Sequence, residues 1–184
     1  MRKIILLIIC LYLGGIIVSS AIDKVEENTF KLSSNKLIHN GLLPIEQVLN
    51  MPDTKGGNVS PQLSWNTPPI NTKSFAIVCH DPDAQKENGW YHWLLVNIPL
   101  NIKSIEQGGK IEGALETVTD FKTTGYGGAY PPVGHGIHHY HFTIYALDVE
   151  KLDVNKNENP VEVEKKIKAH SLANSTITGL FERK

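Results

Sequence analysis

The stretch GGAYPPVGHGIHHYHFTIYALD, residues 127–148, joins a glycine- and proline-rich loop to a long apolar run. The run, residues 138–148, is rich in aromatic and β-branched residues and contains no glycine or proline, which is typical of a β-strand. Because side chains alternate between two faces along a strand, Tyr140, Phe142 and Ile144 share one face. That face is the more apolar one, so we expect it to pack against the core.

Four of the chain's eight histidines lie in this stretch. His138 shares the face of Tyr140 and should point inward at the start of the strand. His139 and His141 fall on the opposite face and should point outward. His135 lies on the loop between two glycines, where it could line the rim of a pocket. The alternation therefore predicts that the four histidines do not form one site.

The rest of the chain also reads mainly as strands separated by Gly-, Pro- and Asn-rich turns. We expect strands at residues 28–34, 73–81, 90–99, 138–148 and 176–183, and a loop running into a strand over residues 56–65. A helix is predicted over residues 159–173, with Asn159 as its N-cap and Pro160 at its first position. Residues 42–50 fit either a short helix or a loop. This order predicts an all-β-dominated fold, a β-sandwich of antiparallel sheets with one or two peripheral helices. We expect the strands that begin near Phe75, Trp90 and Tyr140 to be central and adjacent.

The first residues have the pattern of a secretory signal peptide. Residues 1–21 begin with Arg2 and Lys3, continue with an apolar run over residues 4–18, and close with small residues. The run is short for a membrane span of about 20 residues. We therefore expect export to the periplasm or the medium, with residues 22–184 as one domain; the alternative is an uncleaved N-terminal anchor.

The composition narrows the class of function. The 184 residues are 41% hydrophobic and 20% charged, with a net charge of -1, which argues against nucleic-acid binding through charge alone. Without the signal peptide only Cys79 remains, so no disulfide can form within the mature chain. Cys79 lies in an apolar run and is expected to be a buried core residue rather than a reactive thiol.

Three predicted strands offer inward-facing polar groups at their ends. By alternation Asp81 follows Phe75, Ile77 and Cys79 on one face, and Trp90, His92 and Leu94 share a face of the next strand. The third group is His138, followed by the phenol of Tyr140. A carboxylate next to imidazoles raises their basicity, and imidazolium groups bind small anions such as phosphate. We therefore expect an anion pocket that binds best when these histidines are protonated; the alternative is that each group is simply a satisfied buried polar residue.

Several motifs resemble those of the phosphatidylethanolamine-binding protein family, also called the Raf kinase inhibitor protein family, and its bacterial branch most closely. They are GGNVSPQLSW at residues 56–65, HDPDA at residues 80–84, GWYHWLLVNIP at residues 89–99 and GYGGAYPPVGHGIHHYHFTIYALD at residues 125–148. Together they cover most of the chain after the signal peptide.

The resemblance implies a two-sheet sandwich with a small rigid pocket at one end. It places the pocket on Asp81, Asp83, Trp90, His92, Pro132, His138 and Tyr140. Ligands of the family are small anions such as phosphate, phosphoryl-ethanolamine and acetate, and no metal or cofactor is implied. It also suggests a cis peptide bond between Asp81 and Pro82.

The sequence departs from the family pattern in four places, one of which is an extra histidine, His80, directly before Asp81. His139 stands where an arginine is common, and Ala129 and Tyr130 replace a proline and a frequent cysteine in the loop. The sequence also ends after GLFERK, without the C-terminal helix that borders the pocket in mammalian members. This last difference argues against transferring kinase inhibition to the present chain.

These observations predict a non-enzymatic binding protein for phosphate-bearing headgroups or other small anions, with a possible protein partner. Contact with a membrane would then be limited to lipid headgroups. The main alternative is an exported inhibitor of a protease or another enzyme through a protein–protein interface. Catalysis by Asp81, His92 and His138, and metal binding through His135, His138 and the outward pair His139 and His141, are weaker alternatives.

Overall fold

The computed structural model describes residues 29–184, and two β-sheets make up most of this region. The predicted signal peptide, residues 1–21, lies outside the described residues. Between residues 29 and 184 no helix is both long and apolar enough to cross a bilayer.

The larger sheet contains the three strands that the sequence placed at its centre. Its strands, in spatial order, are β2 (Gly41–Leu42), β9 (Ser171–Phe181), β8 (His138–Leu147), β4 (Ser74–Asp81), β5 (Trp90–Pro99) and β7 (Leu115–Glu116). Neighbouring strands are antiparallel except β2 and β9, which run parallel at one edge. The prediction that β4, β5 and β8 are central and adjacent is confirmed.

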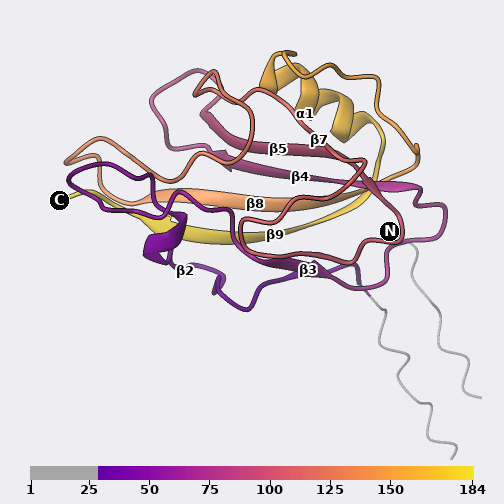
Figure 1. Ribbon diagram of the computed structural model, residues 1–184, viewed down its shortest axis with the longest axis horizontal. Coiled ribbons are helices and arrows are strands. Elements are labelled where there is room, and N and C mark those ends of the chain that lie inside the picture. Colours follow the sequence, from indigo (N-terminus) through magenta and orange to yellow (C-terminus); the bar gives the residue numbers. More distant parts are fainter. Residues whose placement is uncertain (1–28) are drawn as a thin grey trace, which may run out of the picture.

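A smaller sheet covers one face of the larger one, and a helix covers the other. The smaller sheet has the order β1 (Leu32–Ser33), β3 (Leu63–Trp65) and β6 (Ser104–Ile105). Figure 1 shows β3 below the long strands and α1 (Pro160–Ala169) above them. The predicted β-sandwich with a peripheral helix is therefore confirmed. Within residues 42–50, Leu42 ends β2 and the only helix is the short 3-10 helix η1 (Ile45–Gln47).

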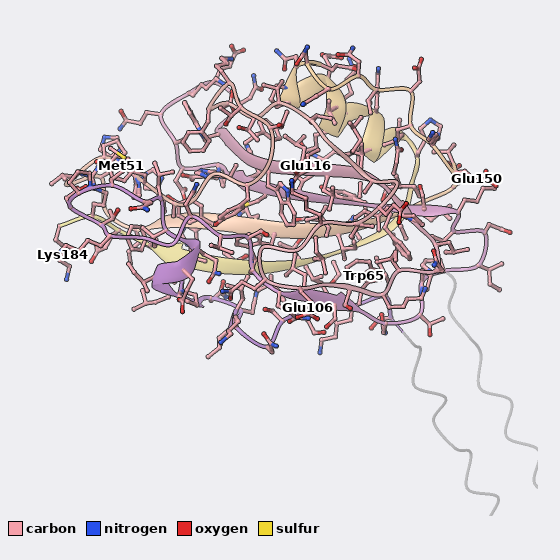
Figure 2. All side chains as sticks on the ribbon, in the orientation of Figure 1. Met51, Trp65, Glu106, Glu116, Glu150 and Lys184 are labelled. Carbon is pink, nitrogen blue, oxygen red and sulfur yellow. The ribbon has the colours of Figure 1, made fainter. Side chains whose placement is uncertain are left out.

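The main core lies between the two sheets. Trp65 of β3 and Phe75 of β4 pack across the interface with ring centroids 5.4 Å apart, and Trp65 is labelled in Figure 2. Phe142 and Ile144 of β8 are fully buried in the same cluster, as their alternation predicted. Burying such side chains stabilises the fold by about 1.5–3 kcal/mol each.

Strand β5 corrects the predicted alternation. The pairing of β4 with β5 shifts register between Cys79 and His80, which opposes Cys79 to Trp93 but His80 to Tyr91. A β-bulge adds one residue to a strand and so reverses the faces of the residues beyond it. Leu94 therefore packs in the outer cluster under α1, and the prediction that it shares the inner face with His92 was wrong.

Helix α1 begins as predicted but ends earlier. The Asn159 side chain accepts a hydrogen bond from the Val161 N–H at 2.9 Å, and Pro160 is the first helical residue. Val163 and Ile167 are fully buried against the outer face of the sheet. Residues 171–173, which the prediction included in the helix, belong to β9 because they pair with the end of β8.

Candidate functional site

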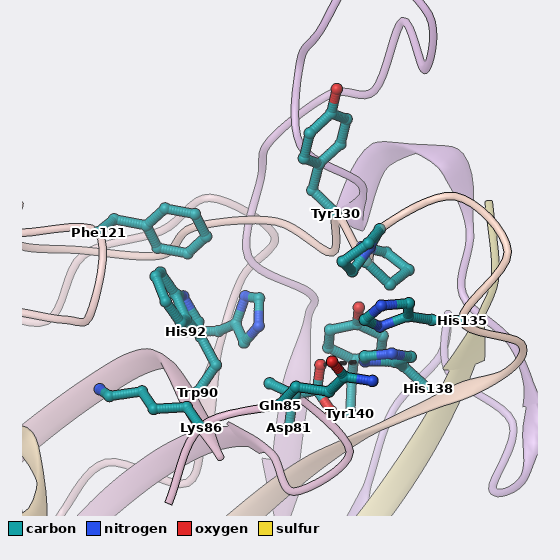
Figure 3. Close-up of a pocket in the computed structure, with 13 residues that line it drawn as sticks. Asp81, Gln85, Lys86, Trp90, His92, Phe121, Tyr130, His135, His138 and Tyr140 are labelled. Atoms are coloured by element: carbon teal, nitrogen blue, oxygen red, sulfur yellow. Dashed lines mark hydrogen bonds and ion pairs between the residues drawn. The ribbon is translucent and has the colours of Figure 1, made fainter. Parts of the chain in front are cut away.

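A cavity of about 560 Å³ opens where β4 ends and where β5 and β8 begin (Figure 3). Antiparallel pairing brings these ends together, since β4 lies between the other two strands. The volume suits a small molecule. The residues that line the cavity are Asp81, Ala84, Gln85, Lys86, Trp90, His92, Phe121, Tyr130, Pro131, Pro132, His135, His138 and Tyr140.

A buried carboxylate–imidazole pair lies at the base of this cavity. Nδ1 of His138 lies 2.7 Å from Oδ2 of Asp81, and both residues are nearly inaccessible, with exposed fractions of 2% and 3%. The carboxylate accepts a hydrogen bond from the Nδ1–H group whether the imidazole is neutral or charged. This bond fixes the ring of His138 and leaves its Nε2 for a ligand, as an acceptor when the ring is neutral and as a donor when the ring is protonated.

The turn after β4 directs Asp81 into the cavity. The second carboxylate oxygen of Asp81 accepts a hydrogen bond from the Asp83 N–H at 2.9 Å, a local turn that aspartate favours. Gly89 closes the loop with a φ of +63°, and a Cβ there would lie 2.4 Å from the Asp81 carbonyl oxygen. The described residues contain no cis peptide bond, so the predicted cis bond before Pro82 was wrong. The side-chain bond to Asp83 orients Asp81 with a trans peptide.

His92 is held in a different way from His138. Its Nδ1 lies 2.7 Å from the carbonyl oxygen of Gly127, and its exposed fraction is 4%. Burial lowers the pKa of His92 to about 4, although the Gly127 carbonyl and the charge of Asp81 act in the opposite direction. His92 is therefore neutral at pH 7. The neutral form prevails in the unliganded site because the loss of solvation outweighs the nearby carboxylate. That His92 binds an anion as an imidazolium stays a prediction.

Two polar groups of the pocket residues lack a hydrogen-bond partner within the described part of the chain. They are the indole Nε1 of Trp90 and the hydroxyl of Tyr140, both buried. Burial, followed by the charge of Asp81, raises the pKa of Tyr140, so its hydroxyl keeps its proton. Both groups can donate a hydrogen bond, and a buried donor without a partner costs about 1–3 kcal/mol.

One wall of the cavity was not predicted from the sequence. Lys86 lies on the loop after β4, forms an ion pair with buried Asp120 and sits 5.5 Å from the centroid of the Trp90 ring. Asp120 also accepts the Tyr91 N–H at 2.8 Å, which ties this wall to β5. No local pattern marks Lys86, since its position depends on a partner 34 residues away.

The proline loop forms the opposite wall. Arg183 donates a hydrogen bond to the carbonyl of Pro131 at 3.0 Å, and its guanidinium stacks 3.8 Å from the centroid of the Tyr130 ring. Both Arg183 and Tyr130 also bond to the carboxylate of Asp53. Residues near the end of the described chain therefore fix the loop that carries Pro132. Tyr130, a departure from the family pattern, takes part in this support as well as lining the cavity.

Six of the seven site residues expected from the resemblance line the cavity. Asp83 does not: its carboxylate accepts hydrogen bonds from the backbone N–H and the ring Nδ1 of His139, each at 2.7 Å. His139 is exposed, as predicted, and His141 is partly buried on the same outer face. His135 lines the cavity as expected, with its ring stacked 5.8 Å from that of His138. That any of these residues binds a ligand stays a prediction.

The outer histidines do not complete a metal centre. Across residues 29–184 no group of three or more His, Cys, Asp or Glu side chains is arranged to hold a metal ion. His138 and His139 each have a carboxylate partner, but the two partners lie on opposite sides of the sheet.

Comparisons with known proteins agree with the motifs. A family model described as phosphatidylethanolamine-binding protein matches residues 33–182. The chain is 43% identical over 157 residues to the protein YbhB of Escherichia coli (strain K12), which covers 82% of this chain and 99% of YbhB. The crystal structure of Escherichia coli YbcL, called a new member of the mammalian PEBP family, matches with a TM-score of 0.81 and 36% identity. That match covers 84% of this chain and 99% of the YbcL chain.

A more distant structure supports the fold alone. The structure of a putative phosphatidylethanolamine-binding protein homologue from Chlamydia trachomatis matches with a TM-score of 0.74 at 24% identity, over 85% of this chain and 99% of that chain. The two-sheet architecture is therefore kept where most of the sequence has changed.

Proposed function

Because this chain belongs to the phosphatidylethanolamine-binding protein family, as its motifs predicted, we propose that its cavity binds small anions that carry a phosphate group. The proposed ligands include inorganic phosphate and phosphoryl-ethanolamine. The protein acts by binding, with no chemical step on the ligand.

The observation that carries this proposal is the set of polar groups at the base of the cavity. Trp90 and Tyr140 contribute donors without partners, and the ring of His138 is fixed by Asp81 with its Nε2 available. A phosphate group has several acceptor oxygens and can satisfy the Trp90 and Tyr140 donors at once, together with Nε2 of His138 when that ring is protonated. Binding would recover the free energy that the unpaired donors cost the unliganded protein.

The same residues support binding rather than covalent catalysis. None of the residues that line the cavity is a serine or a cysteine. Cys79 lies nearby in β4 but is fully buried, and burial raises the pKa of its thiol well above the usual value. A thiol in that setting is a core residue and a poor nucleophile.

Export is the second part of the proposal. It rests on the signal-peptide pattern of residues 1–21. N-terminal sequencing of the protein from its own cells should find a mature chain that begins at or near Ile22, in the periplasm or the medium. Recovery of Met1 from a membrane fraction would favour the anchor instead.

Titration calorimetry with phosphoryl-ethanolamine tests the binding function. His138→Asn keeps a side-chain N–H for Asp81 but removes Nε2, so we expect affinity to fall by about 1.5–3 kcal/mol, as for a hydrogen bond to a charged group. The matched control is His141→Asn, since His141 lies on the outer face and its Nδ1 bonds to the Thr178 hydroxyl. Thermal melts establish that both variants fold.

Two results would count against the proposal. Absence of heat with phosphoryl-ethanolamine and with inorganic phosphate for the wild type would remove the anion-binding function. Equal losses for the His138 and His141 variants would place the binding site outside the cavity.

A further inference from the structure

The hydrogen bond made by His92 fixes which of its nitrogens carries the proton. The partner of Nδ1 is the carbonyl oxygen of Gly127, which can only accept. Nδ1 must therefore hold the proton, and a neutral imidazole has no second one. It follows that Nε2 of His92 carries a lone pair and acts as an acceptor.

His92 is placed to offer this lone pair to a ligand. The residue lines the cavity, and Figure 3 shows its ring between Trp90 and the side chains of Tyr140 and His138. The rings of Phe121 and Tyr140 meet its ring edge to face, with centroids 5.3 and 5.1 Å away. These contacts hold the imidazole in one orientation.

The surroundings of His92 keep it neutral. The polar and charged groups next to it are the carboxylate of Asp81, the phenol of Tyr140 and the carbonyls of Gly127 and Gly128, and the imidazole of His80 acts on it through its charge alone. Burial outweighs the carboxylate and the carbonyls, which would favour the charged form. His92 therefore remains an acceptor throughout the neutral pH range.

The fixed charges of the cavity also limit the charge of a ligand. Asp81 contributes a buried carboxylate, while the ammonium group of Lys86 is paired with the carboxylate of Asp120. No arginine lines the cavity. Apart from the paired Lys86, only the imidazoles of His135 and His138 could add positive charge to the lining. A doubly charged phosphate is repelled by Asp81, whereas a singly charged phosphate meets half that repulsion.

We propose that the cavity selects phosphate groups that still carry a proton, with the P–O–H group donating to Nε2 of His92. The other phosphate oxygens accept from the Trp90 indole and the Tyr140 hydroxyl. The ligand class is then inorganic phosphate and phosphate monoesters in the singly charged form. Phosphodiesters, including the headgroup of an intact phospholipid, have no such proton to give. The inference rests on the proposed anion-binding function and names the form of the anion.

A size-matched pair of ligands provides the first test. Calorimetry at pH 5.5 compares methyl phosphate, which keeps a P–O–H group, with dimethyl phosphate, which does not. We expect the diester to bind at least about tenfold more weakly, because it leaves the acceptor on His92 unpaired. Phosphoryl-ethanolamine and glycerophosphoryl-ethanolamine repeat the comparison with an ethanolamine group present.

The pH dependence provides the second test. The second ionisation of a phosphate monoester lies near pH 6. Affinity for methyl phosphate should therefore fall on the order of 50- to 100-fold between pH 5.5 and pH 8, as the protonated form disappears. Dimethyl phosphate keeps its single charge throughout and reports any change due to the protein's own groups.

A substitution at His92 provides the third test. His92→Gln replaces the acceptor with an amide that can also donate, so the preference for the monoester should shrink to less than about threefold. His141→Gln, the same change on the outer face, should keep the full preference. Nitrogen NMR of the wild type should show a protonated Nδ1 and an unprotonated Nε2, and it does not depend on any variant folding.

The outcomes separate this inference from the function on which it rests. Equal affinity for methyl and dimethyl phosphate, or a protonated Nε2 on His92 at neutral pH, would overturn the inference and leave anion binding in place. If neither ligand bound at either pH, both would fall together.

Discussion

The two faces of β8 carry histidines at neighbouring positions, and these histidines differ in how far they are buried. His138, on the inner face, bonds to Asp81 with both side chains almost completely buried. His139, one residue later, makes an equally short bond to Asp83, but 46% of its side chain and 39% of that of Asp83 remain exposed. Two Asp–His pairs of the same chemistry and length therefore lie on opposite sides of one sheet.

The difference shows that burial, and not the Asp–His pair itself, determines whether an imidazole can bind a ligand strongly and how much its pair contributes to stability. The inner pair is shielded from water and lies next to donors without partners, so the free nitrogen of His138 meets a ligand in a medium of low dielectric constant. The outer pair is screened by water, and its contribution to stability is small.

Removal of the imidazole from each pair should separate the two most clearly. His138→Ala leaves the Asp81 carboxylate buried and unpaired, which should lower the free energy of unfolding by about 3–5 kcal/mol. His139→Ala breaks an exposed pair and should cost less than about 1 kcal/mol. Urea unfolding followed by circular dichroism measures both. Similar losses would mean that the two pairs do not differ in solvation as described.

A smaller effect is expected from acid. The pKa of His92 is about 4 in the folded protein, against an ordinary value of 6.5. The unfolded chain therefore binds more protons than the folded one between these values, and the free energy of unfolding should fall by about 3 kcal/mol as pH drops from 6.5 to 4. In His92→Gln this slope should be missing from urea unfolding curves measured across the range.

His141 provides the outer-face control for the acid prediction. Burial, followed by the charges of His139 and His80, lowers the pKa of His141, so its effect has the same sign. Because His141 is only partly buried, His141→Gln should flatten the pH dependence less than His92→Gln does. A larger flattening in the His141 variant would reverse the contrast between the faces.

The packing of α1 against the outer face of the sheet should depend on its N-cap residue, Asn159. Asn159→Ala removes the side-chain acceptor for the Val161 N–H and should cost about 1 kcal/mol. Through Val163 and Ile167 this loss would loosen α1 from the sheet. Asn157→Ala, at an exposed position before the helix, is the matched control for urea unfolding and should change stability by less than about 0.5 kcal/mol.

The smallest effect concerns the charge of Asp83. Burial alone would raise its pKa, but hydrogen bonds from the ring and the backbone N–H of His139 outweigh it, so the pKa lies below 3.8. The stabilising contribution of the carboxylate is therefore complete above pH 3.8 and disappears as pH falls through the folded-state pKa. Carbon NMR titration should place the midpoint below 3.8 and move it upward in His139→Ala. An unchanged midpoint would show that the ring does not stabilise the carboxylate.

Features that follow from local periodicity could be predicted from the sequence alone. Alternation in residues 138–148 placed Tyr140 and Phe142 inside and His139 outside, because the two-residue period of a strand is fixed by its backbone. Asn159 and Pro160 marked the start of α1, since capping is a local interaction. The family motifs named six of the residues that line the cavity, with no knowledge of how the strands pair.

The tertiary structure decided the features that depend on distant partners. The bulge between β4 and β5 reversed the side of Leu94, and Asp83 turned outward because His139 lies on the adjacent strand. Lys86 reached the cavity through an ion pair with Asp120. The protonation state of His92 also depends on distant partners, because only the fold buries its ring and places the Gly127 carbonyl next to Nδ1. Desolvation then lowers the pKa of His92, although the sequence had already suggested a carboxylate, Asp81, nearby.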